Sequence, residues 1–89
     1  MAYSSYATDS FWSSYDSLPE EIRSQADKQF ALFSTNPNHP SLRLKPVGAL
    51  WSARVSKSYR VLARRRGDAF YWFWIGTHAD YEKLLDQNQ

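Results

Sequence analysis

Apolar residues recur at helical spacing in the first half of the chain, and they alternate or run together in the second half. The helical stripe predicts a helix over residues 18–34 and consists of Ile22, Ala26, Phe30 and Phe33. Ser17 and Glu20 have the spacing of a capping box, and Pro19 falls in the first turn, so this helix is expected to begin there. Residues 36–40 contain two prolines and predict the loop that follows it.

A shorter pattern precedes this helix. Residues 2–7 are rich in serine and predict a short strand. Thr8 or Asp9 can then cap a short helix, because both side chains accept hydrogen bonds from free backbone N–H groups. The buried face of that helix would consist of Phe11, Trp12 and Tyr15.

Four strand candidates follow the loop, and the first three of them precede the aromatic run near the end of the chain. Residues 41–45 form a short candidate that stops before Pro46. Residues 49–55 alternate Trp51 and its apolar neighbours with polar positions, which is typical of a half-buried strand. A turn at residues 56–58 leads into a third candidate, residues 59–66, and Gly67 then provides a tight turn.

The last strand candidate is a continuous apolar and aromatic run over residues 70–75, which predicts a strand buried on both faces. After Gly76, Thr77 and Asp80 have capping-box spacing, so a short helix is expected to start there. His78 and Tyr81 would lie in its first turn. The free N–H groups of such a helix end suit a phosphate or another anion.

These elements predict an α+β fold. Two N-terminal helices are expected to pack on one face of a curved, mainly antiparallel sheet of four to five strands, followed by a short C-terminal helix. With 89 residues the chain has room for one domain, residues 1–89, and its 17% of aromatic residues help a small core bury enough area.

Composition narrows the chemistry. The chain has no cysteine and only two histidines, so neither disulfides nor a zinc site made by protein ligands is expected. The first residues lack the basic and apolar regions of a signal peptide, and no apolar run reaches the roughly 20 residues that cross a bilayer. We therefore expect a soluble, cytoplasmic protein with no membrane partner.

The charges are unevenly distributed along the chain. Formal net charge is only +2, yet no acidic residue occurs between Asp27 and Asp68. That span holds nine of the eleven basic residues, namely Lys28, Arg43, Lys45, Arg54, Lys57, Arg60, Arg64, Arg65 and Arg66. Such a distribution predicts one basic surface, and its natural partners are nucleic acid phosphates or an acidic protein segment.

The order of helices, loop and strands, together with residues 50–55, 59–62 and 76–81, resembles the RelE/ParE toxin superfamily. The resemblance is greatest to the RelE and HigB-like branch of bacterial type II toxin–antitoxin systems, and it extends from about Phe11 to Leu85. It implies a ribosome-dependent endoribonuclease that cuts mRNA, inhibits translation and is neutralised by a cognate antitoxin protein. It implies no metal and no small-molecule cofactor.

The resemblance also implies roles for individual residues. It places at catalytic positions Arg54, Arg60, His78 and Tyr81, and it places in an RNA-binding surface Arg43, Lys45, Lys57 and Arg64. Metal-free RNA cleavage needs a base for the 2′-hydroxyl, an acid for the leaving oxygen and cations for the phosphorane charge. Histidine titrates near neutral pH, arginine matches phosphate oxygens, and a tyrosine can stack on a base or donate its hydroxyl. The sequence leaves open which residue is the base.

Other interpretations of the same residues stay open. Arg60 could occupy the solvent face of a half-buried strand, and Arg54 could pair with Asp80 or Glu82. Residues 64–66 could be solvated or contact an antitoxin. The protein could also be a ParE-like toxin that acts on DNA gyrase without cleaving RNA, which needs no His/Tyr pair, or an inactive member that only binds a partner.

Overall fold

The computed structural model describes residues 3–87 as three α-helices and one sheet. The chain forms β1 (Ser4–Ala7), α1 (Asp9–Asp16) and α2 (Glu20–Thr35), then a 3-10 helix, η1 (Pro40–Leu42). The second half forms β2 (Lys45–Val47), β3 (Leu50–Ser56), β4 (Tyr59–Arg66), β5 (Ala69–Thr77) and α3 (His78–Gln87). The predicted α+β class, the N-terminal helices and the short C-terminal helix are confirmed.

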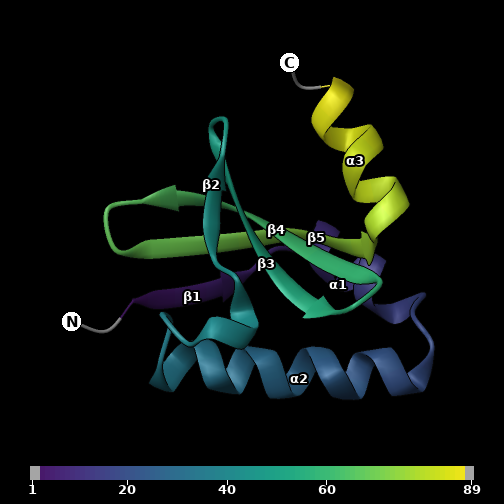
Figure 1. Ribbon diagram of the computed structural model, residues 1–89, viewed down its shortest axis with the longest axis horizontal. Helices are drawn as coiled ribbons and strands as arrows, with labels where there is room; N and C mark the ends of the chain where they lie inside the picture. The colour runs from purple at the N-terminus through teal and green to yellow at the C-terminus, as the bar shows by residue number, and fades with distance from the viewer. Residues whose placement is uncertain (1–2, 88–89) are drawn as a thin grey trace.

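The sheet has five strands in the order β1-β5-β4-β3-β2. Strands β2 to β5 are joined by short turns and pair antiparallel, whereas β1 pairs parallel with β5. The last strand is therefore paired on both sides over part of its length. Figure 1 shows α2 along one side of the sheet and α3 rising from the other side.

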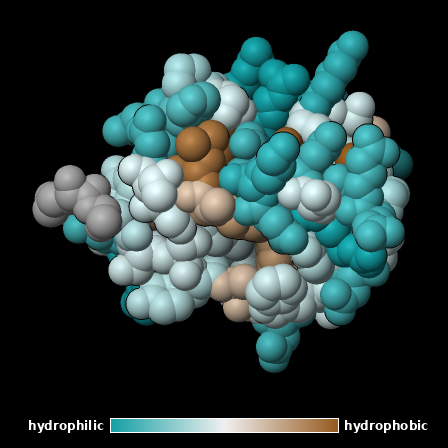
Figure 2. All heavy atoms as spheres, turned by 90° about the horizontal axis from the view of Figure 1, so that it is seen from below, coloured by the Kyte–Doolittle hydropathy of each residue, from teal (hydrophilic) through white to brown (hydrophobic). Residues whose placement is uncertain are grey.

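The core lies between the sheet and the two N-terminal helices. Phe33 of α2 meets Phe70 and Trp72 of β5 edge to face, with ring centroids 5.2 and 5.3 Å apart. Phe11 of α1 meets Phe30 in the same geometry. Such edge-to-face pairs add to the free energy gained by area burial. The surface beneath α2 is mostly hydrophilic, as Figure 2 shows, which fits a helix with only one apolar stripe.

The first strand predicted after the loop, at residues 41–45, is wrong. Pro40 starts a 3-10 turn there, and His39 Nδ1 accepts a hydrogen bond from the Ser41 N–H at 3.1 Å. Arg43 then adopts a left-handed conformation with φ 47°, which ends the turn. The strand begins only at Lys45 and runs through Pro46, which is compatible with an edge strand that needs few backbone donors.

The predicted start of the long helix is also corrected. Ser17 ends α1, and its hydroxyl donates to the Ser14 carbonyl at 2.8 Å. No capping box forms, because Pro19 occupies the N-cap position and makes no side-chain cap. By contrast, Thr8 does cap α1 by accepting from the Phe11 N–H.

Strand β5 is not buried on both faces. Phe70, Trp72 and Ile75 are buried, whereas Tyr71 is 36% exposed. The N-terminal helices cover Phe70, Trp72 and Ile75 on one face of β5, whereas Tyr71 on the other face is left exposed. None of the helices within residues 3–87 is long and apolar enough to cross a membrane.

Candidate functional site

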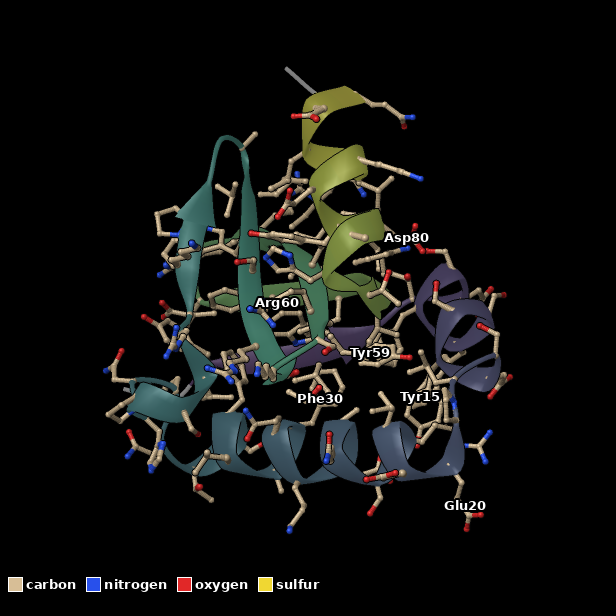
Figure 3. All side chains as sticks on the ribbon, turned by 45° about the vertical axis from the view of Figure 1, so that its right-hand side comes forward. Tyr15, Glu20, Phe30, Tyr59, Arg60 and Asp80 are labelled. Carbon is tan, nitrogen blue, oxygen red and sulfur yellow. The ribbon has the colours of Figure 1, made fainter. Side chains whose placement is uncertain are left out.

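Two arginines face each other on the central strands of the sheet. Arg54 of β3 and Arg60 of β4 are cross-strand partners, and such partners project from the same face. Tyr59, the residue before Arg60 on β4, packs on the helix side, so Arg60 points to the face that carries α3. Figure 3 shows Tyr59 and Arg60 diverging in this way. Both arginines are half-buried.

The guanidinium of Arg60 is fixed by backbone carbonyls. Its Nη1 donates to the carbonyls of Ser56 at 2.7 Å and Tyr59 at 2.9 Å, with a longer contact of 3.4 Å to Lys57. These carbonyls belong to the β3–β4 turn, so the turn orients the side chain. A preoriented planar cation suits recognition of phosphate oxygens.

Positive charge is concentrated around Arg60. Burial lowers the pKa of Arg60, and the nearby charges of Arg54 and then Arg43 lower it further, while Tyr81 acts in the opposite direction. The group still carries its charge at neutral pH, because an arginine titrates far above that range. Within residues 3–87, no carboxylate pairs with Arg54 or Arg60. An anion would relieve this repulsion.

Tyr81 is the residue that attaches α3 to this face of the sheet. Only 6% of it is exposed, and its hydroxyl donates to Ser52 Oγ on β3 at 3.3 Å. Ser52 is itself buried and pairs with Leu62 of β4, so Tyr81 covers the strand positions next to Arg54 and Arg60. In this conformation the ring of Tyr81 has no room to stack on a base.

His78 lies beside Tyr81 in the first turn of α3, with ring centroids 5.6 Å apart. Its Nδ1 is 3.0 Å from Glu82 Oε1, one helical turn along, and its side chain is 43% exposed. A carboxylate that accepts from Nδ1–H leaves Nε2 as the free nitrogen of the neutral ring. His78 thus has an orienting partner and access to solvent.

The N-terminus of α3 is less suited to an anion than the sequence suggests. The His78 N–H donates to the Ser58 carbonyl at 2.7 Å, which ties α3 to the β3–β4 turn. The Asp80 N–H donates to Thr77 Oγ1 at 3.2 Å, so Thr77 caps the helix as predicted. Two of the first N–H groups are therefore already occupied.

The predicted RNA-binding residues divide into two groups. Lys45 pairs with Ser52, so it lies on the same face as Arg54, and Lys57 lies in the turn that holds Arg60. Arg43 is close enough to lower the pKa of Arg60. Arg64 is separate.

Arg64 lies four residues farther along β4, with its guanidinium carbon 4.5 Å from the centroid of the Phe73 ring. Arg65 has a structural role. It points to the helix side, stacks on Tyr3, Trp51 and Phe70, and lies 4.0 Å from Asp68.

Three features of this face escape sequence reasoning. Glu82 pairs with His78, which the helical spacing of the two residues could have indicated. Ser52 anchors Tyr81, and nothing in the sequence distinguishes it from other serines. Tyr6 and Tyr71 stack at the surface, although they are far apart in the sequence. In the described part of the chain, no cluster of three or more His, Cys, Asp or Glu side chains could hold a metal ion.

Comparison with known proteins identifies the family. The model of a family described as the ParE-like toxin domain matches residues 20–83. The chain belongs to this family. The ParE-like toxin domain therefore includes both arginines, the histidine and the tyrosine of the site. No curated protein sequence matches the chain significantly.

Solved structures share the fold of this ParE-like domain. E. coli YafQ superposes with a TM-score of 0.70 at 11% identity, covering 89% of this chain and 97% of YafQ. A mutant of E. coli toxin RelE in the free state gives 0.65 at 15% identity, covering 98% of both chains. The archaeal RelE–RelB complex from Pyrococcus horikoshii gives 0.65 at 15% identity, covering 86% and 96%. The family match confirms the predicted RelE/ParE superfamily, and these structural likenesses confirm its fold.

Proposed function

We propose that this ParE-like protein is the toxin of a type II toxin–antitoxin system and acts as a metal-independent endoribonuclease on mRNA at the ribosome. The observation that supports it is the convergence of Arg54, Arg60, Tyr81 and His78 on one face of the sheet. Two arginines can stabilise the charge that develops on the phosphate, and a solvent-accessible histidine can transfer a proton, as cleavage through the substrate's own 2′-hydroxyl requires. The protein would act in the cytoplasm.

The proposed roles follow from position. Arg54 and Arg60 bind the scissile phosphate and stabilise the charge that develops on it. His78 transfers a proton through Nε2, and Glu82 keeps its ring oriented. Tyr81 positions the first turn of α3 through Ser52, and its hydroxyl comes within reach of substrate only if α3 shifts. Arg43, Lys45, Lys57 and Arg64 contact the phosphates of the RNA chain.

A cognate antitoxin is the proposed protein partner. The Pyrococcus horikoshii relative was solved as a RelE–RelB complex, and the basic face of this chain suits an acidic or amphipathic segment. Expression of the protein alone should arrest growth, and co-expression of the antitoxin should restore it. Harmless expression of the intact, folded protein would count against toxicity.

Mapping mRNA ends after adding the purified protein to translating ribosomes tests the enzymatic activity. His78→Gln should lower cleavage by roughly 10²–10⁴-fold. The matched control is His39→Gln, which removes the other histidine, located at the start of η1, and should leave cleavage unchanged. A folded His78→Gln protein with full activity would exclude the histidine from the mechanism.

A second function deserves the same assay series, because the matching family is described as ParE-like. A toxin of that kind would trap cleavage complexes of DNA gyrase and leave mRNA intact. The same preparations should therefore be incubated with gyrase and supercoiled DNA. Cleaved DNA without mRNA cuts would favour the gyrase toxin, and neither product would favour an inactive binding protein.

A further inference from the structure

The sheet face that carries α3, Arg54 and Arg60 has a second surface, on the far side of α3. Tyr6 of β1 and Tyr71 of β5 are cross-strand partners whose rings stack with centroids 5.2 Å apart and 18° between the planes. The two residues are 52% and 36% exposed. Tyrosine rings usually bury their apolar body, so a stacked pair left open to solvent is unlike the other aromatic pairs of the core. We call Tyr6 and Tyr71 the tyrosine pair.

Cations adjoin the tyrosine pair. Arg64 is the partner of Tyr71 on β4, so Tyr6, Tyr71 and Arg64 form one row across three strands. Arg66 lies two residues farther along β4 and is exposed. Among residues 3–87, neither Arg64 nor Arg66 pairs with a carboxylate. A hollow of about 690 Å³ opens here, and its lining includes Leu50, Tyr71 and Arg64.

The row lies on the same sheet face as the candidate catalytic residues. Arg60 and Arg64 are four residues apart on β4, a distance of about 13 Å in an extended strand. The positions between them are covered by Tyr81, so the two surfaces lie on either side of the first turn of α3. A short stretch of extended polynucleotide would reach both.

We propose that the tyrosine pair, with Arg64, is a stacking site for the bases of single-stranded RNA on one side of the cleavage site. The inference rests on the proposed function and specifies how the substrate strand is held. Exposed aromatic rings beside unpaired arginines are the combination that binds single strands without sequence preference, since rings stack on bases and guanidinium groups bind phosphates. An acidic antitoxin segment would be attracted by the arginines but would not need the rings.

The test compares two labelled oligonucleotides of about 12 nucleotides, a length within the roughly 4–16 nucleotides that one single-strand-binding OB fold covers. One is oligoadenylate RNA, and the other has the same backbone without bases. Affinities are measured by fluorescence anisotropy. Tyr6→Ala and Tyr71→Ala should each weaken oligoadenylate binding by roughly 5- to 100-fold and change abasic binding less than twofold.

Conservative variants provide the controls. Tyr6→Phe and Tyr71→Phe keep the ring and should bind like the unmodified protein, which separates stacking from any role of the hydroxyl. Arg64→Gln should lower the slope of log affinity against log salt by about one unit, because it removes one phosphate contact. Lys28→Gln removes an exposed charge from α2, on the other side of the sheet, and should leave the slope unchanged.

The proposal would be overturned if the alanine variants bound oligoadenylate as tightly as the unmodified protein does. Unchanged RNA binding combined with loss of antitoxin inhibition would also overturn it and assign the tyrosine pair to protein docking. Failure of the nuclease proposal is distinguishable. If the tyrosines govern oligoadenylate affinity but no mRNA is cut on ribosomes, the stacking site stands and the enzymatic activity does not.

Discussion

Replacing Arg54 with glutamine should make this protein more stable and less active. Arg54 faces Arg60 directly across β3 and β4, and Arg60 cannot turn away because two backbone carbonyls hold its Nη1 at 2.7 and 2.9 Å. The repulsion between them is therefore a standing cost of the folded state. Arg54→Gln removes the charge and keeps a polar side chain of similar length.

The size of the effect can be estimated from the geometry. Like charges at directly opposite strand positions destabilise a sheet by roughly 0.2–1 kcal/mol. For a domain of this size, 1 kcal/mol corresponds to about 4–8 °C in Tm, so a gain of about 1–8 °C is expected at low salt. If Arg54 stabilises charge on a phosphate, cleavage should fall by roughly 10²–10³-fold.

Thermal unfolding at low salt, at about 1 M salt and with added inorganic phosphate separates the causes. High salt shortens the screening length to about 3 Å, so the gain should shrink there. Phosphate should stabilise the unmodified protein more than Arg54→Gln, because it relieves the same repulsion. Lys28→Gln controls for the change in net charge. The argument would be refuted if Arg54→Gln were less stable than the unmodified protein at low salt, or if its stability depended on salt in the same way as that of Lys28→Gln.

Three further outcomes follow from individual contacts. Tyr81→Phe should lower the free energy of unfolding, measured by urea denaturation, by roughly 0.5–1.5 kcal/mol. Ser52→Ala should lower it by at least as much, because the buried Tyr81 hydroxyl then loses its partner. Additive losses in the double mutant would contradict a shared hydrogen bond. Gly76→Ala should cost roughly 1–3 kcal/mol, since its Cβ would collide with the Trp74 indole, and an unchanged Tm would refute this. The hydrogen bond from the Tyr15 hydroxyl to the Asp27 carboxylate raises the pKa of Tyr15 above 10.0. This bond therefore stabilises the fold below that pH, and the stabilisation is lost as pH rises through the folded-state pKa. Tyr15→Phe should lack this alkaline loss when unfolding is measured against pH, and a pH profile identical to that of the unmodified protein would count against the argument.

Much of this fold follows from local patterns. The helical stripe from Ile22 to Phe33 predicts α2 to within two residues at its N-terminal boundary and one at its C-terminal boundary, and the Thr77 cap marks the start of α3. Prediction failed where proline geometry and side-chain capping compete with strand propensity. At residues 40–43 a 3-10 turn and a left-handed Arg43 replace the expected strand. Ser17 is the C-cap of α1, so it does not cap α2 as its spacing predicted.

The site was predicted in part. The family resemblance suggested the arginines, the histidine and the tyrosine, and their catalytic roles stay a prediction. The structure brings Arg54, Arg60 and Tyr81 together, with His78 adjacent to Tyr81. It could not show that Tyr81 is buried, because burial depends on how α3 lies on the sheet. The ion pairs considered for Arg54 with the acids of α3 do not form among residues 3–87.

The sequence by itself determined most of the helices and strands, their order and the uneven charge, because periodicity, caps and turns act over a few residues. Only the tertiary structure decided which side chains share a face. Tyr6 and Tyr71 meet because β1 joins β5 in parallel register, and Arg64 joins them through the pairing of β4 with β5. A shift of one residue in either register would turn each side chain to the opposite face, and that register is set by burial of the aromatic core.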